Sequence, residues 1–351
     1  ITFNDGTVDG STALEYVTVE YAGGNAGNLY LTSASPTIKN STIQKSSSHG
    51  IYLSSSNPII QNTTIDGATY GIYGSSSSPT IRDSIIKNTG NYGLYIAYGT
   101  PSITGSRIER GLYLYGDTGT ITGNTIVNAT SYPIQAGQNM VGQVVSQNTF
   151  ENVQPGDTLN VLGGQVSSSA TWKNVGLTYI VTSTVNVYST PSSAPVLTIE
   201  PGVTVKFNQN TGLTIGYTYY NVYPGALNAV GTAAAPIIFT SNQTTPTPGF
   251  WSGITFNNGT VNADTILDYV TVEYGGGGTG NIYFTSASPT IKNSVIRKSA
   301  NYGIYATSSS AVIQDSTIFE NSSYGIYSSY SPLTVTGNII SNNGSYGLYD
   351  T

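Results

Sequence analysis

Apolar residues recur along this chain at two nested spacings. Within short segments, Ile, Leu or Val alternates with Ser, Thr or Tyr, which is the pattern of a strand with one buried face. Along the chain the same segments return after about 22 residues, in three columns that we name by their first five members: Ile38, Ile60, Ile81, Ile103 and Ile121; Ile43, Ile65, Ile86, Ile108 and Ile126; Leu29, Ile51, Ile72, Leu94 and Leu112. Three short strands in each repeat predict one coil of a parallel β-helix, an all-β solenoid.

A tyrosine motif follows the same repeat. Tyr70-Gly71-Ile72-Tyr73 returns in similar form at Tyr92, Tyr302, Tyr324 and Tyr346. Because the Ile or Leu of each strand points inward, the following Tyr must point outward. The sequence therefore predicts a tyrosine stripe of Tyr30, Tyr52, Tyr73, Tyr95 and Tyr113, continued in a later part of the chain by Tyr283, Tyr305, Tyr327 and Tyr349. Such a stripe either stabilises neighbouring coils or provides a contact surface for another rod or a glycan.

One further column predicts a tight corner between the strands that contain the first two apolar columns named above. It contains Asn40, Asn62, Asp83, Gly105, Gly123, Asn293, Asp315 and Gly337. Asn, Asp and Gly enter the left-handed backbone region at the lowest cost. We therefore interpret this column as structural.

A much longer repeat contains the short one. Residues 1–52 match residues 254–305 at a constant offset of 253, with 36 of 52 positions identical. The expected organisation is one full repeat at 1–253, with longer and irregular coils over 135–253, and the first part of a second copy at 254–351, as one continuous β-helix. Both ends of the sequence fall inside the repeat pattern, so we expect the parent chain to be longer.

Composition narrows the function. The chain has no Cys, only 8% charged residues and a net charge of −6 without a basic run, which argues against disulfides and nucleic-acid binding. No stretch is apolar enough for a membrane span. Glycosylation sequons begin at Asn40, Asn62, Asn128, Asn242, Asn258, Asn321 and Asn343, which favours an exported chain.

A tyrosine-rich segment interrupts the irregular region. Tyr217, Tyr219, Tyr220 and Tyr223 lie between the apolar residues Ile215 and Leu227. We expect an inserted loop that either protrudes as a contact surface or folds back over the coils.

Five segments resemble secreted and cell-surface proteins with right-handed β-helix repeats, which belong to the pectate-lyase-like superfamily: Leu197 to Val205, Leu227 to Thr232, Pro236 to Ser241, Trp251 to Ile254 and Leu267 to Tyr274. The resemblance covers nearly the whole chain and implies a right-handed β-helix. Since many members of that group are surface or adhesive proteins, it implies no particular activity.

Candidate catalytic residues are few. The single His, His49, has Tyr302 at its equivalent position, so we interpret it as a corner residue that Tyr can replace. Asp66, Lys87 and Glu109, with Arg107 and Arg110 nearby, share an outward column. Opposite charges attract between neighbouring coils, so this column is expected to be a charge ladder. The acidic Glu15 and Glu20, matched by Asp268 and Glu273, are interpreted in the same way.

No metal or cofactor motif is present, and we expect no enzyme activity. The sequence favours a structural extracellular fibre or cell-surface stalk whose partner is another copy of itself. A surface adhesin that binds glycans through the tyrosine stripe or the loop at Tyr217 is the alternative, and a polysaccharide lyase or hydrolase is the weaker one.

Overall fold

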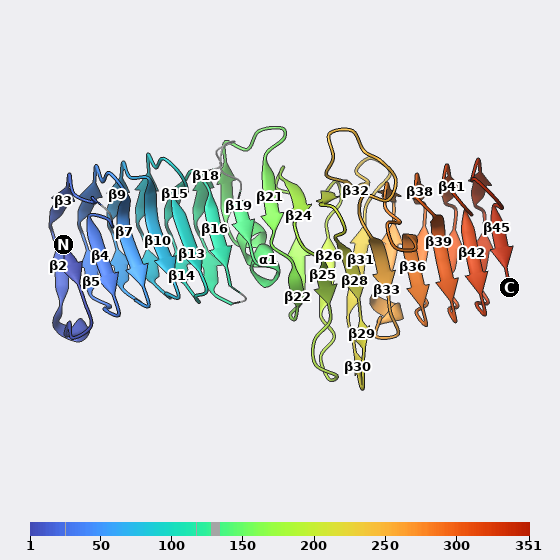
Figure 1. Ribbon diagram of the computed structural model, residues 1–351, viewed down its shortest axis with the longest axis horizontal. Coiled ribbons are helices and arrows are strands. Elements are labelled where there is room, and N and C mark those ends of the chain that lie inside the picture. Colours follow the sequence, from blue (N-terminus) through green and yellow to red (C-terminus); the bar gives the residue numbers. More distant parts are fainter. Residues whose placement is uncertain (25, 117, 128–133) are drawn as a thin grey trace. The chain divides into compact units, whose positions relative to one another are not determined.

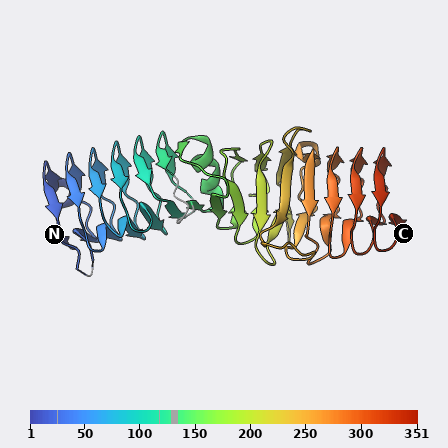
Figure 2. The same cartoon turned by 90° about the horizontal axis from the view of Figure 1, so that it is seen from above.

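The computed structural model describes residues 1–24, 26–116, 118–127 and 134–351. It comprises two compact units, Ile1–Asn160 (unit 1) and Val161–Thr351 (unit 2), which we describe separately. In both units short strands stack in parallel, each pairing with its counterpart one coil away (Figure 1). Figure 2 shows the same stacking from above. The predicted parallel β-helix is therefore confirmed.

The coils of unit 1 contribute strands to three sheets, and the last coil has no strand in the second of them. The tyrosine sheet contains β1 (Thr2–Phe3), β4 (Leu29–Thr32), β7 (His49–Ser54), β10 (Tyr70–Ser75), β13 (Leu94–Ala97), β16 (Leu112–Tyr115) and β19 (Ile134–Ala136). The second sheet contains β2 (Ala13–Glu15), β5 (Thr37–Lys39), β8 (Ile59–Gln61), β11 (Thr80–Arg82), β14 (Ser102–Thr104) and β17 (Thr120–Thr122). The third contains β3 (Thr18–Glu20), β6 (Thr42–Gln44), β9 (Thr64–Asp66), β12 (Ile85–Lys87), β15 (Arg107–Glu109), β18 (Thr125–Val127) and β20 (Thr149–Glu151).

The coils of unit 2 also contribute strands to three sheets, which we name by the sequence pattern of their strands. Its tyrosine sheet contains β22 (Gly164–Val166), β25 (Val185–Val187), β28 (Gly212–Ile215), β33 (Gly253–Phe256), β36 (Gly280–Thr285), β39 (Tyr302–Thr307), β42 (Ile326–Ser329) and β45 (Leu348–Asp350). The second contains β23 (Ala170–Trp172), β26 (Val196–Ile199), β31 (Ala226–Val230), β34 (Ile266–Asp268), β37 (Thr290–Lys292), β40 (Val312–Gln314) and β43 (Thr334–Thr336). The third contains β24 (Thr178–Val181), β27 (Thr204–Phe207), β32 (Ile237–Ser241), β35 (Val270–Glu273), β38 (Val295–Arg297), β41 (Thr317–Phe319) and β44 (Ile339–Ser341).

Some elements depart from this pattern. Strand β21 (Thr158–Val161) lies at the unit boundary, and β29 (Tyr217–Thr218) with β30 (Val222–Tyr223) forms an antiparallel hairpin. Short 3₁₀ turns η1 (Asp9–Ser11) and η2 (Asn262–Asp264) precede the second sheet. Helix α1 (Gln138–Ser146) buries Met140, Val141, Val144 and Val145 against unit 1. The sequence pattern predicted irregular coils here but no helix.

The apolar columns form the core of unit 1. All fifteen Ile and Leu residues of the three predicted columns are completely buried. In unit 2 the larger irregular coils are filled by aromatic rings, and the Phe207 and Trp251 rings stack at 4.1 Å. Burial of a side chain of this kind contributes about 1.5–3 kcal/mol.

The predicted corner is also confirmed, because every member of the Asn, Asp and Gly column has a positive φ, from 47° at Asn62 to 67° at Gly123 and Gly337. The structure adds two further left-handed corners to the coil. Lys45, Asn88, Arg110, Lys298 and Glu320 occupy the one after the third-sheet strand, and Ser33, Ser55, Ser76, Ser286 and Ser308 occupy the one after the tyrosine-sheet strand. The Lys, Arg, Glu and Ser residues at these corners did not predict a bend from the sequence.

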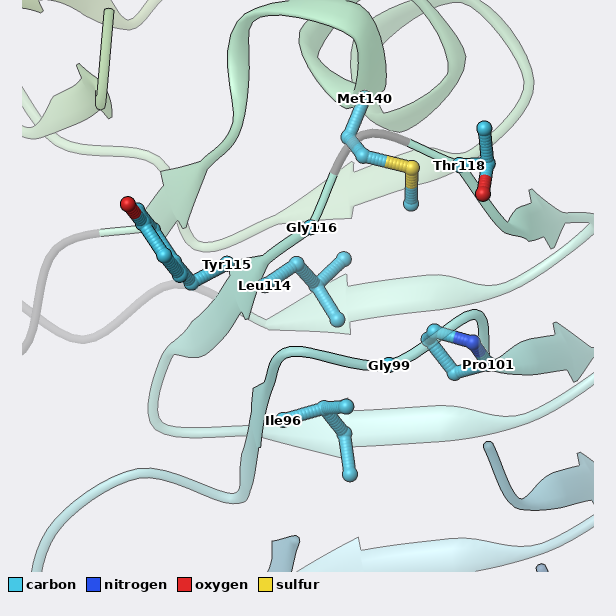
Figure 3. Close-up of a pocket in the computed structure, with 8 residues that line it drawn as sticks. All are labelled: Ile96, Gly99, Pro101, Leu114, Tyr115, Gly116, Thr118 and Met140. Atoms are coloured by element: carbon cyan, nitrogen blue, oxygen red, sulfur yellow. The ribbon is translucent and has the colours of Figure 1, made fainter. Parts of the chain in front are cut away.

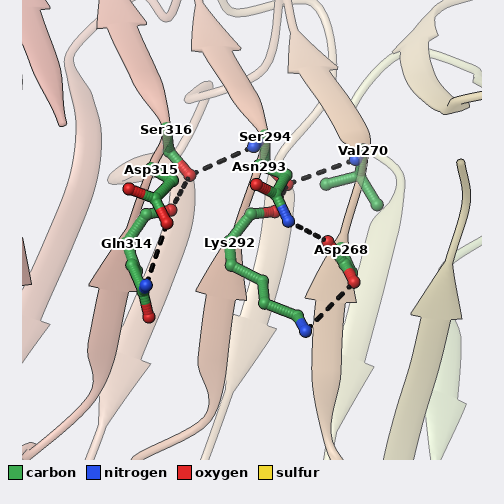
Figure 4. Close-up of polar contacts among 8 residues, drawn as sticks. All are labelled: Asp268, Val270, Lys292, Asn293, Ser294, Gln314, Asp315 and Ser316. Carbon is green, nitrogen blue, oxygen red and sulfur yellow. Dashed lines mark hydrogen bonds and ion pairs between the residues drawn. The ribbon is translucent and has the colours of Figure 1, made fainter. Parts of the chain in front are cut away.

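A buried hydroxyl ladder follows the predicted corner. Ser84 accepts a hydrogen bond from the Thr63 backbone N–H at 3.2 Å and donates to the Arg82 carbonyl at 2.9 Å. In unit 2 the Val270 and Ser294 backbone N–H groups donate in the same way to the hydroxyls of Ser294 and Ser316 (Figure 4). The ladder therefore satisfies backbone donors that the bend would otherwise leave buried and unpaired.

The second 253-residue copy joins the first inside unit 2. Strands β33, β34 and β35, which open the second copy, pair in parallel with β28, β31 and β32 of the first. The Trp251 indole N–H donates to the Glu273 carbonyl at 2.9 Å across this junction. Each of the three sheets thus continues from one copy into the next.

Candidate functional site

The tyrosine stripe of unit 1 is an ordered stack of rings. Its members pair in register on adjacent strands, as in Tyr52 with Tyr73 and Tyr73 with Tyr95. Successive centroids from Tyr30 to Tyr113 lie 4.9, 5.5, 4.8 and 4.2 Å apart, with interplanar angles of 15° or less. The sequence prediction that these side chains share one outward face is confirmed.

The stripe of unit 2 is less regular. Tyr305 and Tyr327 stack at 4.9 Å and 3°, whereas Tyr283 meets Tyr305 edge to face. Tyr327 and Tyr349 lie 5.6 Å apart. In both units a second aromatic column lies beside the stripe, formed by the first Tyr of the motif, as in the stack of Tyr302 on Tyr324 at 5.6 Å.

His49 belongs to that second column. It begins strand β7 and stacks on Tyr70 at 5.4 Å, so the prediction that it lies at a corner is wrong. Tyr302 begins the equivalent strand β39, which agrees with the predicted exchange of His for Tyr. The His49 Nδ1 lies 2.6 Å from the Ala26 carbonyl oxygen, which assigns the ring proton to Nδ1. Burial lowers the pKa of His49, so the ring is neutral at pH 7.

Stacking also changes the acidity of the stripe. Burial, and secondarily the neighbouring Tyr113, raises the pKa of Tyr95 to about 12. Burial likewise raises the pKa of Tyr52, Tyr73 and Tyr305. The phenols therefore remain neutral hydrogen-bonding groups at physiological pH.

The geometry of the stack limits what the stripe can contact. Rings that stack along the unit 1 coils cover one another's faces, and the residues are only partly exposed. A sugar ring that stacks on an aromatic residue needs a free face. The stripe thus presents ring edges and hydroxyls outward, with little aromatic face available between successive coils.

The outward charges form pairs. Lys87 lies opposite Asp66 with 3.4 Å between the Nζ and a carboxylate oxygen. Glu109 pairs with Arg107 at 3.2 Å, and Arg107 also contacts Glu151 at 2.7 Å. Arg110 donates to the Thr89 and Gly90 carbonyls.

The acidic residues at equivalent positions in the two copies also form ion pairs. Glu15 pairs with Lys39 and Glu20 with Lys45, while Asp268 pairs with Lys292 and Glu273 with Arg297. The carboxylates of the last two pairs are more buried than those of the first two, because Asp268 and Glu273 are covered by the preceding coil at the junction between copies. Each carboxylate named here is engaged by a cation of its neighbouring coil.

The tyrosine loop is the hairpin β29–β30, which extends from unit 2 in Figure 1. Its base folds back: Tyr217 stacks on Tyr188 at 5.1 Å and lies 5.8 Å from Tyr223. Its tip protrudes, since Tyr219 is 65% and Tyr220 87% exposed. The hairpin therefore folds back at its base and protrudes at its tip, and a contact role for the tip stays a prediction.

A groove of about 290 Å³ lies at the hairpin base, lined by Tyr217, Thr218, Asn257, Asn258 and Thr285. Of these residues, Tyr217 and Asn258 were predicted from the sequence as candidate site residues, and Asn257 and Thr285 were not. No sequence signal marks the groove, because it forms where the hairpin of the first copy meets the opening coil of the second.

The sequons differ in their surroundings. Asn321 is 1% exposed, and its amide donates to the Asn343 side-chain oxygen at 2.9 Å. The Asn62 amide donates to Asn40 and the Asn242 amide to Asn208. Asn258 is exposed at a turn. The sequon at Asn128 lies outside the described residues.

A second recess is small. Figure 3 shows an apolar recess in unit 1 between α1 and the coils, where Met140 approaches Ile96 and Leu114, and it leaves no room for a water molecule. Within the described residues no group of three or more His, Cys, Asp or Glu is placed to hold a metal ion. Over the same part of the chain, no helix has the length and apolar character needed to cross a membrane.

Stacked coils of parallel strands, with left-handed corners at the bends of the regular coils, define the chain as a parallel β-helix protein. The family model of the right handed beta helix region matches residues 4–108 and 167–351. The chain belongs to this family, as its resemblance in sequence implied. The comparisons with curated proteins and with solved structures found no match.

Proposed function

We propose that the chain is a structural segment of a tandem-repeat β-helix that serves as an extracellular fibre or cell-surface stalk. The observation that carries this proposal is the junction inside unit 2. Phe256, Leu267 and Val272 of the second copy are completely buried there by the last coils of the first. Copies that join through paired strands and a shared core can follow one another without a flexible linker.

The stacked side chains support the same role. Aromatic pairs in register contribute about 0.5–1.5 kcal/mol each beyond their burial, and opposite charges on neighbouring strands add to this. The tyrosine stripe and the Lys87–Asp66 pair therefore act between coils. The low charge and exposed sequon of Asn258 favour an extracellular location.

The test is a designed chain with one, two or three complete 253-residue copies. If copies join as they do in unit 2, small-angle scattering will give a constant cross-section and a length that grows in proportion to copy number. Separate compact particles joined by mobile segments would contradict the proposal. Antibody labelling of intact, unpermeabilised source cells tests the extracellular location independently.

Binding of glycans along the stripe is the alternative, and it predicts that Tyr73→Ser abolishes binding on a glycan array without changing the fold. The stacked geometry favours the structural role instead, in which Tyr73→Ser lowers the melting temperature while Tyr220→Ser at the hairpin tip leaves it unchanged.

A further inference from the structure

The groove at the base of the hairpin β29–β30 is polar, uncharged and partly aromatic. Its five lining residues supply one phenol ring, two amides and two hydroxyls, and none of them is charged. Its volume of about 290 Å³ is close to the lower end of small-molecule pockets, ~300 Å³. A neutral sugar ring has the matching chemistry, with hydroxyls for the amides and a C–H face for the ring of Tyr217, which is 39% exposed although one of its faces stacks on Tyr188.

The turn that carries Asn258 is held directly against the hairpin. The Thr260 backbone N–H donates to the Asn257 carbonyl at 2.8 Å, which closes the turn. At Gly259 a Cβ would lie 2.4 Å from the Tyr223 carbonyl oxygen and 2.7 Å from the Tyr217 nitrogen, so only Gly fits. The sequon Asn258-Gly259-Thr260 is thus fixed at the edge of the groove.

Asn258 differs from the other sequons of the described residues. The amides of Asn40, Asn62, Asn242, Asn321 and Asn343 each donate to an oxygen of a neighbouring coil, and a sugar on them would replace those bonds. Asn258 is exposed and its side chain lines the groove. Among these sites, Asn258 is the one where an attached sugar costs no contact between coils.

We propose that Asn258 carries an N-linked oligosaccharide whose first sugar lies in the groove against Tyr217. In the transfer, the Asn258 Nδ2 forms a bond to C1 of a sugar carried on a lipid diphosphate. The C1–O bond to the diphosphate breaks, the lipid diphosphate leaves as an anion, and the amide proton passes to a base of the transferase. The Thr260 hydroxyl donates to the Ile215 carbonyl at 3.1 Å in the folded coil, so transfer precedes closure of that coil.

The inference rests on the proposed export of the chain, and its test keeps the two apart. The full 351-residue chain is secreted from a host with N-glycosylation, and the folded product is examined by peptide mass spectrometry. The expected result is a sugar on Asn258, none on Asn321, and loss of one oligosaccharide mass in Asn258→Gln. Secreted, folded protein without a sugar on Asn258 would overturn the inference and leave the structural proposal intact.

The position of the sugar is tested by the rate at which an endoglycosidase cuts between the first two sugars. A first sugar held against Tyr217 is shielded, so Tyr217→Ser speeds release several-fold, whereas Tyr217→Phe keeps the ring and the wild-type rate. Tyr220→Ser, at the exposed tip of the same hairpin, is the matched control and leaves the rate unchanged. Equal rates for Tyr217→Ser and wild type would show that the groove does not hold the sugar.

Discussion

At the scale of single residues, Tyr16, Lys45 and Arg110 adopt the same left-handed backbone as Asn40, with φ values between 50° and 65°. For residues other than Gly this conformation costs roughly 1–2 kcal/mol, and Asn and Asp enter it most readily. The coil therefore imposes the conformation through pairing and core burial. Local preference supports the imposed conformation at residues such as Asn40 and Asn88, and opposes it where Tyr16, Lys45 or Arg110 stands.

The first prediction concerns Asn62, which has a φ of 47°. A β-branched side chain is poorly tolerated at positive φ, so Asn62→Val should lower stability by about 1–2 kcal/mol. Asn62→Gly removes the same hydrogen bond to Asn40 but keeps the backbone relaxed, and it should cost less. Denaturant unfolding of both variants provides the measurement. Equal losses would place the cost in the side-chain bond and contradict the backbone explanation.

The second prediction follows from the raised pKa of Tyr95, about 12 against the ordinary 10. The folded state favours the neutral phenol, so its contribution to stability is complete below pH 10 and is lost as the pH rises towards 12. Melting temperatures should fall across this window, and the fall should be smaller in Tyr95→Phe. A tyrosinate absorbance titration of the folded protein supplies the direct check. Ionisation of all tyrosines near pH 10 would contradict it.

At the scale of elements, the strands are too short to be stable alone. Most have three or four residues, and they gain stability from pairing on both sides and from the hydroxyl ladder at the corners. At Asn124 the ladder continues with an amide, whose oxygen accepts from the Ser106 backbone N–H at 2.9 Å. The position therefore requires a hydrogen-bond acceptor on a short side chain, and this acceptor need not be a hydroxyl.

The third prediction tests that requirement. Ser84→Ala leaves the buried Thr63 N–H without its acceptor and should cost about 1–3 kcal/mol. Ser84→Asn introduces the residue that occupies the equivalent position at Asn124, and it should recover most of the loss. Thermal unfolding of the pair decides the point; an Ala variant as stable as wild type would mean that the ladder contributes nothing.

The elements also show why sequence reasoning succeeded in part. The Ile columns and the Asn40 corner repeat the same residue types, so the period alone located strands, core and one bend. Helix α1 was not predicted because its spaced apolar residues include three Val, which favour strands. The groove was not predicted because Tyr217 and Thr285 are far apart in sequence and meet only through the junction of the two copies. Periodicity therefore predicts the features that every coil shares, and it cannot predict a helix or a groove that occurs only once in the chain.

At the scale of the whole molecule, the junction between copies is as well packed as the coils within them. Trp251 of the first copy is completely buried, stacks on Phe207 and donates to Glu273 of the second. The copies are therefore coupled through a shared core. The packing of unit 2 therefore continues across the point in the sequence where the second copy begins.

The fourth prediction uses this residue. Trp251→Ala should destabilise unit 2 by about 3–5 kcal/mol and raise amide hydrogen exchange in β33 to β35. Trp172→Ala removes a stacked, buried indole of the same unit away from the junction, and its extra exchange should centre on β23 and β26 instead. If both variants raise exchange at the same strands, the indole of Trp251 has no special role in joining the copies.

The direction of the hydroxyl ladder has a mechanical consequence. Each corner N–H donates forward, as Thr63 does to Ser84 and Ser84 to Ser106, so a coil is complete only when the next one is in place. Under tension applied from the C-terminal end of unit 1, we expect the last coil to give way first, which would expose the donor of the coil before it. Extension would then proceed in steps of one coil, each releasing a similar length of chain. The β-helix would therefore unfold gradually under load and not in a single event.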